Sequence, residues 1–446
     1  MAAAVPTRAR RRAALIALML AVALGACQNK DPILPGERIP VRPPEEPVAG
    51  AARSHGLALP PASMNADWAA RPGSTGARLP NAALRPVPQL IWSLDIGTGD
   101  AKRRRILTGP VVAGPYVYAL DANGQLSAAT RDGRLAWSVS IVPPNQLPDS
   151  GPGGGMTVQG GVLFVGTGFG EVLALDPATG GIRWRRMLAA PVQAAPAVAA
   201  GRVVVVSRDD MAYGLDPQTG ATLWQNQGIG GPGLLGGASP AVNGKLAVLP
   251  FASGEVTGVL ARNGLQVWST AVTGGHREFA RSSITDISGD PVFDGAGTVY
   301  AANQSGRAVR LDADTGERAW TLQEGSYGPA WPVGGSVFLL SDTGALVRVD
   351  AATGELLWQR QLPEYFPNPG WFGRGKPYEA IPYYGPVLAG SRLWVAGADG
   401  LLRAFGPADG APLGQVQFEG GAAGPPAVAG GVMYLSTRDG KLLAFQ

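Results

Sequence analysis

Residues that commonly carry out chemistry are scarce in this chain of 446 residues. It has one cysteine, Cys27, and two histidines, His55 and His276, which lie far apart in the sequence. A zinc site takes several His or Cys ligands at close spacings, and a Ser or Cys nucleophile usually needs a histidine beside it as a base. The residue types therefore predict no metal site, no cofactor and no catalytic group.

One glycine-rich segment, Gly166-Thr-Gly168-Phe-Gly170, has a superficial likeness to a nucleotide-binding loop. Such a loop works at the start of a helix, where the first backbone N–H groups bind phosphate. Here the segment lies within a predicted hairpin and no helical pattern follows it. We interpret it as a turn.

Cys27 stands where a lipid anchor requires it. A basic region (Arg8, Arg10, Arg11 and Arg12) precedes the apolar run AALIALMLAVA at residues 13–23, which is too short to span a membrane as a mature helix. The following Leu24-Gly25-Ala26-Cys27 resembles the lipobox of bacterial lipoproteins, which implies removal of residues 1–26 and acylation of Cys27. An ordinary secretory signal with a chance cysteine is the alternative. Gln28, rather than Asp, favours the outer membrane, with the protein facing the periplasm.

The basic charge of the sequence belongs to this leader. The four arginines before Cys27 are part of 37 basic residues, and the rest of the chain has 33 bases and 33 acids. The mature protein is therefore expected to be close to neutral, which removes the main argument for nucleic-acid binding. With a single cysteine, no disulfide can form within the chain.

The rest of the sequence is organised by a repeat, best seen in Pro196 to Trp224. This stretch predicts four short antiparallel strands, PAV, RVVVV, MAYGLD and ATLW, separated by turns rich in Gly, Asp and Pro. One such sheet cannot cover both of its faces, so its copies must stack on each other.

Three recurring sequence features mark these copies. A tryptophan closes each unit at intervals of 38–52 residues, a length typical of one propeller blade. A glycine between the second and third strands is expected to have a positive φ, with Asp210 in its place in one unit. The third turn has the form Asp-x-x-Thr-Gly, whose carboxylate can accept backbone N–H groups of its own turn. The tryptophans are Trp92, Trp137, Trp184, Trp224, Trp268, Trp320 and Trp358, and Gly414 stands in that place in the seventh unit.

The two ends of the repeat region predict how the ring closes. The eighth unit stops at Gln446 without a fourth strand, and a spare strand, Pro88 to Trp92, lies at the start. Borrowing it would leave no open edge at the join. We expect a signal peptide at 1–26, a lipidated cysteine and Pro-rich tether at 27–85, in which Trp68 is a candidate to dock, and an all-β, eight-bladed propeller at 86–446.

Repeats of the form ALDPxTGxxxW resemble the PQQ-like β-propeller family, named for quinoprotein dehydrogenases. The resemblance covers nearly the whole chain after residue 85. With a lipobox and one eight-bladed domain, the chain is similar to the lipoproteins of the outer-membrane β-barrel assembly (BAM) complex. That resemblance implies a non-enzymatic, monomeric scaffold that binds the periplasmic domains of BamA, the barrel that inserts other barrels.

The same resemblance implies where the partner binds. It assigns contacts to a leucine-rich loop containing Leu234, Leu235 and Gly236, and to a second loop containing Arg281 and Asp286. The alternative is that Arg281 and Asp286 pair with each other or cap backbone at the rim, because polar loop residues often serve local turns.

Two further hypotheses stay open. One is a PQQ-dependent quinoprotein dehydrogenase, although those enzymes usually carry calcium ligands and often adjacent cysteines; the other is an adaptor lipoprotein for a different envelope complex. A long aromatic insertion, Gln361 to Pro386, either anchors an interface or folds over its own rim or into the central channel.

Overall fold

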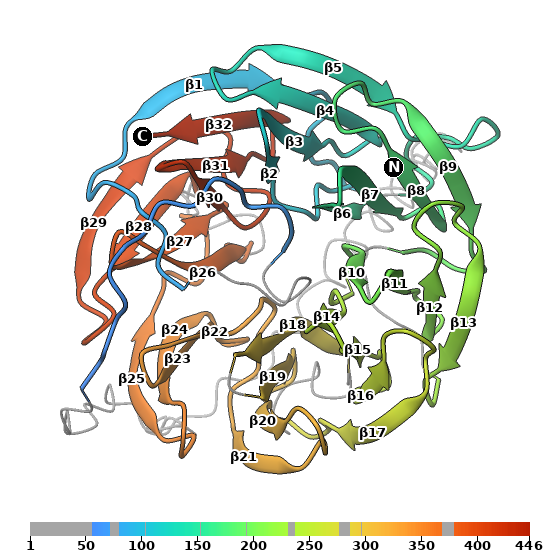
Figure 1. The fold of residues 1–446 in the computed structure, drawn as a ribbon. Helices are drawn as coiled ribbons and strands as arrows, with labels where there is room; N and C mark the ends of the chain where they lie inside the picture. The colour runs from blue at the N-terminus through green and yellow to red at the C-terminus, as the bar shows by residue number, and fades with distance from the viewer. Residues whose placement is uncertain are drawn as a thin grey trace, which may run out of the picture. The chain divides into compact units, whose positions relative to one another are not determined.

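The computed structural model describes residues 56–71, 80–102, 104–151, 153–192, 194–230, 237–275, 286–295, 297–367 and 379–446. These belong to the second of two units into which the chain divides, Val48–Gln446. Eight four-stranded antiparallel sheets form a ring of blades (Figure 1). This confirms the predicted eight-bladed propeller. Within the described ranges, no helix has the length and apolar character needed to cross a membrane.

The first four blades follow one another along the chain. Blade 1 has β2 (Val111–Ala113), β3 (Tyr116–Leu120), β4 (Gln125–Thr130) and β5 (Leu135–Ser140). Blade 2 has β6 (Gly154–Gln159), β7 (Val162–Thr167), β8 (Glu171–Leu175) and β9 (Ile182–Met187). Blade 3 has β10 (Ala197–Ala199), β11 (Arg202–Val206), β12 (Met211–Leu215) and β13 (Thr222–Gln227). Blade 4 has β14 (Ala241–Val242), β15 (Leu246–Pro250), β16 (Glu255–Leu260) and β17 (Gln266–Ala271).

The second half of the ring repeats the pattern. Blade 5 has β18 (Ile287–Asp294), β19 (Thr298–Asn303), β20 (Ala308–Asp312) and β21 (Arg318–Leu322). Blade 6 has β22 (Trp331–Val333), β23 (Ser336–Leu340), β24 (Ala345–Asp350) and β25 (Leu356–Gln361). Blade 7 has β26 (Tyr383–Ala389), β27 (Arg392–Gly397), β28 (Leu401–Phe405) and β29 (Pro412–Gln417). Blade 8 has β30 (Ala427–Ala429), β31 (Val432–Ser436), β32 (Lys441–Phe445) and, from the start of the repeat region, β1 (Leu90–Asp95).

The last blade is completed by the borrowed strand, as the sequence predicts. β1 pairs antiparallel with β32, from Leu90 opposite Phe445 to Asp95 opposite Lys441. Hydrogen bonds along a whole strand therefore join the two ends of the propeller.

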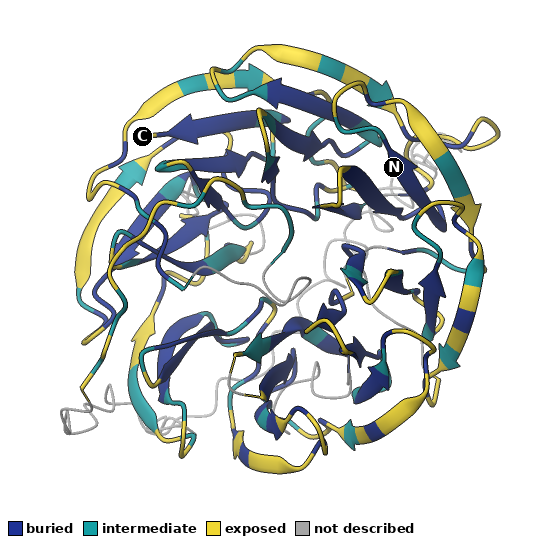
Figure 2. Ribbon diagram, in the orientation of Figure 1, coloured by how far each residue is buried: buried dark blue, intermediate teal, exposed yellow. Residues whose placement is uncertain are grey.

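Burial follows the position of each strand in its blade (Figure 2). The middle strands are packed on both faces by neighbouring blades, so β7 (VLFVGT) is buried throughout. The outermost strands have one neighbour and meet solvent, so β9 (IRWRRM) is exposed or half-buried throughout. Continuous apolar runs thus mark inner strands, and mixed composition marks outer ones.

Seven of the eight blades are fastened to the next blade by an outer tryptophan. The indole Nε1–H of Trp184 donates to the backbone carbonyl of Pro217, 3.0 Å away in the third turn of the next blade. The same turn brings Gly220 so close that a Cβ there would lie 2.6 Å from the Trp184 ring. Six more pairs of a tryptophan with a carbonyl repeat this bond: Trp92–Arg131, Trp137–Pro177, Trp224–Ala261, Trp268–Ala313, Trp320–Ala351 and Trp358–Pro407.

The turn that receives the tryptophan is built by its own aspartate. Oδ1 of Asp216 accepts the N–H groups of Gln218 and Thr219, both at 2.9 Å, and the Thr219 hydroxyl at 3.0 Å. Gly220 has φ +71°, a conformation that costs residues with a Cβ. The predicted chemistry of the Asp-x-x-Thr-Gly turn is confirmed, and its glycine has a second role beneath the tryptophan.

The segment before β1 adds a second fastening. We call residues 56–71 and 80–84 the strap. Trp68 exchanges both backbone hydrogen bonds with Val112 of blade 1, at 2.8 and 2.9 Å, and its ring stacks on Trp331 of blade 6 at 6.2 Å. The prediction that Trp68 docks is confirmed. As far as it is described, the segment expected to be a tether lies against the propeller from residue 56 onward.

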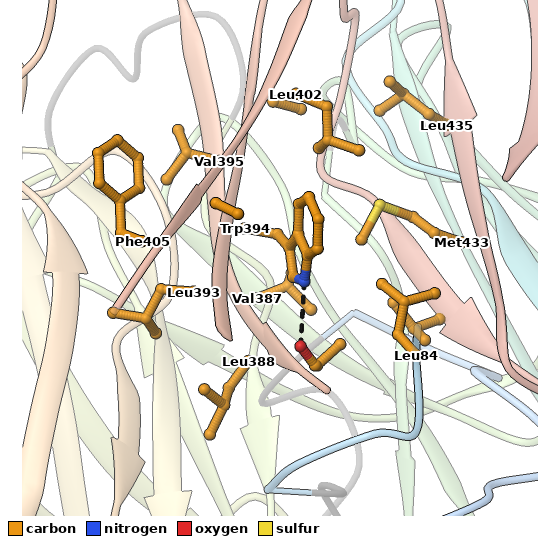
Figure 3. Close-up of a cluster of buried hydrophobic side chains, with 14 of the residues drawn as sticks. Leu84, Val387, Leu388, Leu393, Trp394, Val395, Leu402, Phe405, Met433 and Leu435 are labelled. Atoms are coloured by element: carbon orange, nitrogen blue, oxygen red, sulfur yellow. Dashed lines mark hydrogen bonds between the residues drawn. The ribbon is translucent and has the colours of Figure 1, made fainter. Parts of the chain in front are cut away.

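The strap also bridges the junction that lacks a tryptophan. Ala82 lies beside Ala389 of blade 7, and Asn65 bonds to the backbone of Val428 and Gly430 in blade 8. Figure 3 shows Leu84 beside Met433, in an apolar cluster that spans blades 6, 7 and 8. Where Gly414 replaces the tryptophan between blades 7 and 8, the strap contacts both blades.

Replacing Gly220 by alanine tests the contact between tryptophan and turn. Gly220→Ala should lower the free energy of unfolding by roughly 3 kcal/mol, because it adds a clash with Trp184 to the cost of a positive φ. Gly201→Ala is the matched control, since Gly201 also has φ +71° but has nothing within 4 Å of the added carbon. It should cost about 1 kcal/mol. Urea unfolding measures both, and equal losses would contradict the account.

Asp216→Asn tests the turn carboxylate. Backbone hydrogen bonds from Thr219 and Gln218 lower the pKa of Asp216 below its usual value. The stabilisation is therefore present above the unfolded-state pKa and is lost as the pH falls through the folded-state pKa. The variant should melt below the wild type at pH 6, and the gap should narrow toward pH 3. A gap that is constant with pH would show that the carboxylate charge has no part in the turn.

Candidate partner-binding site

The antiparallel blades give the ring two different faces. The turns joining the first to the second strand, and the third to the fourth, lie on one face, and the connections between blades lie on the other. The strap lies on the first, where Asp67 accepts the N–H of Gly114 and Asn81 bonds to Ser391. We call these the strap face and the connection face. The described ends of both predicted partner loops, Gly237 and Asp286, lie in connections between blades.

A small hollow opens on the connection face where blades 3, 4 and 5 meet. Its volume is about 40 Å³. Its walls come from three successive connections between blades and from two hairpin turns: Pro191, Ala194, Val206, Ser207, Arg208, Asp210, Gly237, Ala238, Pro250, Ala252, Asp286 and Ile287. Apolar side chains and the charged residues Arg208, Asp210 and Asp286 share the walls of the hollow.

Asp210 joins two of these walls. Its carboxylate accepts the N–H of Ala252 at 2.7 Å and that of Ser253 at 3.2 Å, so the turn of blade 3 holds the turn of blade 4. Burial raises the pKa of Asp210, and the two N–H groups oppose that shift. Asp210 has φ +58°, in the position where other units have glycine. Asp210 thus provides a bond between blades that glycine lacks.

The structure describes one of the five residues predicted to bind the partner. Asp286 is buried and lines the hollow, directly before β18. Leu234, Leu235, Gly236 and Arg281 lie outside the described residues, as does Cys27. The described neighbours Gly237 and Ala238 also line the hollow. The two predicted loops therefore end at the same hollow, which their separation in the sequence does not reveal.

Sequence reasoning missed Ser239 and Asp290 as part of this region. Oδ1 of Asp290 accepts the N–H of Ser239 at 2.7 Å, and the Ser239 hydroxyl accepts the N–H of Ala195 at 3.0 Å. The signal that could have found Asp290 is an aspartate in the middle of an inner strand, because a buried carboxylate requires partners.

The aromatic insertion is described only at its two ends. Tyr365 and Ala380 form a β-bridge, and the N–H of Phe366 donates to the Glu379 carbonyl at 3.0 Å. The Arg438 guanidinium lies 5.9 Å from the centre of the Phe366 ring. These ends lie against the rim of blades 7 and 8, which agrees with the prediction that the insertion folds over its own rim. Residues 368–378 lie outside the described residues.

Among the described residues, no group of three or more His, Cys, Asp or Glu side chains is placed to hold a metal ion. The tryptophans and aspartates of the repeat are engaged in blade contacts and turns. The fold is an eight-bladed β-propeller in which the repeat residues make blade contacts and turns, and the irregular connections differ from blade to blade.

The chain belongs to the family described as outer membrane protein assembly factor BamB, whose model matches residues 116–360 and 343–446. It is 27% identical over 260 residues to the Yersinia pestis protein of that name, and the match covers 56% of this chain and 65% of that relative, just under two thirds.

Solved structures share the architecture. BamB from Moraxella catarrhalis has a TM-score of 0.63 at 23% identity, with 81% of this chain and 98% of that chain covered. A quinohemoprotein alcohol dehydrogenase from Pseudomonas putida HK5 has a TM-score of 0.62 at 14% identity, with 82% and 78% covered. At these identities the structural likeness shows the fold alone.

Asp210→Ala tests the bond that holds the hollow together. It removes the acceptor of two partly buried N–H groups, so the free energy of unfolding should fall by roughly 1–3 kcal/mol. Asp210→Asn is the matched control, because its amide oxygen still accepts and Asn tolerates the left-handed conformation. Chemical denaturation measures both. An alanine variant as stable as the wild type would remove Asp210 from this account.

Proposed function

We propose that this chain is a lipid-anchored scaffold of the BAM complex, holding the periplasmic domains of BamA. The observation that carries the proposal is the match to the BamB family over most of the propeller. In this proposal residues 1–26 are a signal peptide, Cys27 is lipidated, and the propeller faces the periplasm from the outer membrane. The stretch between Cys27 and the strap would be the tether.

The partner would bind on the connection face, around the hollow between blades 3 and 5. We assign the contacts to Leu234, Leu235 and Gly236 from one loop, and to Arg281 and Asp286 from the other. Support comes from the described ends of the two loops, Gly237 and Asp286, which both line the hollow. Apolar side chains beside a small number of charged ones are the usual composition of a binding hot spot.

The mechanism in this proposal is positional. A ring whose blades are fastened by tryptophans and a strap presents its connections with little loss of entropy on binding, which favours affinity. A lipid anchor would raise the local concentration of the scaffold near its partner. The chain itself would catalyse no reaction.

Binding of the soluble propeller to the purified periplasmic domains of BamA tests this proposal directly. Surface plasmon resonance should show saturable binding by residues 28–446, and Leu235→Asp should weaken it by roughly tenfold or more, because it places a charge in an apolar contact. Leu147→Asp is the control. Leu147 is 70% exposed on a different connection, so that variant should bind like the wild type. Failure of the wild type to bind would refute the proposal.

Titration with pyrroloquinoline quinone and calcium tests the enzymatic alternative. We expect no saturable change in fluorescence of the propeller, because the repeat tryptophans and aspartates already serve blade contacts and turns. Tight binding, together with reduction of a dye in the presence of an alcohol, would favour the dehydrogenase instead. The quinohemoprotein likeness gives this alternative a shared fold and nothing more.

A further inference from the structure

The strap reaches the interior of the ring through Arg71. Its Nε lies 2.9 Å from Oδ2 of Asp290, and the two side chains are 15% and 0% exposed. Asp290 lies halfway along β18, the innermost strand of blade 5, whereas the strap begins its contacts on blades 6, 8 and 1. Figure 1 shows the strap crossing the face of the ring and turning toward its centre. Arg71 therefore links the strap face to the middle of the ring.

The other carboxylate oxygen of Asp290 extends this chain of contacts toward the connection face. Oδ1 accepts the N–H of Ser239, which precedes β14 of blade 4. The Ser239 hydroxyl in turn accepts the N–H of Ala195, which precedes β10 of blade 3. One carboxylate thus joins the strap to the starts of three successive blades.

These starts are where the proposed partner loops end. Ser239 is three residues after Gly236, and Asp290 is four residues after Asp286. Ala194, Ala238 and Asp286 line the hollow beside them. The geometry of the hollow therefore depends on how firmly Asp290 holds Ser239.

Arg71 favours the ionised form of the Asp290 carboxyl group, which accepts the N–H of Ser239. A fully buried carboxylate is costly without a cation, and burial alone raises the pKa of Asp290 while Arg71 lowers it. Without Arg71, the carboxyl group would take up a proton or turn toward water. Either change weakens its bond to the Ser239 N–H, since an ionised acceptor makes the stronger hydrogen bond.

We propose that Arg71 is a positioning residue for the partner-binding face, acting through Asp290 and Ser239 from the opposite side of the ring without touching the partner. This inference rests on the proposed function, because it takes the partner to be the periplasmic domains of BamA. It makes the strap part of the binding machinery as well as a fastening of the ring.

Two readouts on folded protein test the inference. Arg71→Met should weaken binding to the purified periplasmic domains of BamA by roughly tenfold and speed hydrogen exchange at the Ser239 N–H. The double variant Arg71→Met/Asp290→Asn should regain most of the binding affinity and most of the protection of the Ser239 N–H from exchange. It leaves no unpaired charge, and the amide oxygen of the new residue still accepts from Ser239.

Asp67→Asn is the matched control within the strap. Asp67 accepts the N–H of Gly114 and lies 3.2 Å from Arg131, so its loss disturbs the strap on blade 1 without touching Asp290. Binding and Ser239 exchange should stay at wild-type values. Should Arg71→Met fail to fold, the single variant Asp290→Ala, which removes the acceptor of the Ser239 N–H, replaces it with the same expectation of weaker binding and faster exchange.

The outcomes separate the inference from the function on which it rests. Arg71→Met that is folded at the assay temperature and binds like the wild type, or leaves Ser239 exchange unchanged, overturns the inference while the scaffold stands. A wild-type chain that does not bind BamA overturns both. If Asp67→Asn weakens binding as much as Arg71→Met, the strap acts only as a general fastening and the specific role of Arg71 is refuted.

Discussion

The structure depends most on one repeated contact, an outer tryptophan seated over the third turn of the following blade. The indole donates to a carbonyl of that turn, and the turn's glycine has no room for a Cβ beneath the ring. Because the same aspartate-built turn recurs, a single local geometry is enough to fasten blade to blade. A sheet that covers only part of its own surface is thereby converted into a closed ring.

The junction between blades 7 and 8 lacks this tryptophan contact, and the strap contacts both of these blades. Blade 7 has Gly414 where the tryptophan belongs, and the strap binds blades 7 and 8 with Ala82 and Asn65. Between Asn65 and Ala82 in the chain, Trp68 contacts blade 1 and Arg71 lies within the ring. The strap that contacts both blades at the junction without a tryptophan thus also reaches the residues beside the connection face.

Much of the fold could be predicted because the same sequence features recur in successive repeats. The closing strand, the turn aspartates and the turn glycines follow from local chemistry repeated many times, and the structure bears them out. The path of the strap could not be predicted beyond Trp68, because its contacts occur once and join residues far apart in the chain. For the same reason the sequence does not single out Asp290. Its role requires knowing that Ser239 and Arg71 meet it inside the ring, and no spacing in the sequence encodes that.

The central claim concerns the two faces of the ring: the strap occupies one face, and we propose that the partner binds the other. Cross-linking mass spectrometry of the assembled complex of this chain with BamA tests it most directly. The account predicts that cross-links from BamA's periplasmic domains cluster on the connections between blades 3, 4 and 5. Cross-links concentrated on the strap, or on the turns of the strap face, would contradict it.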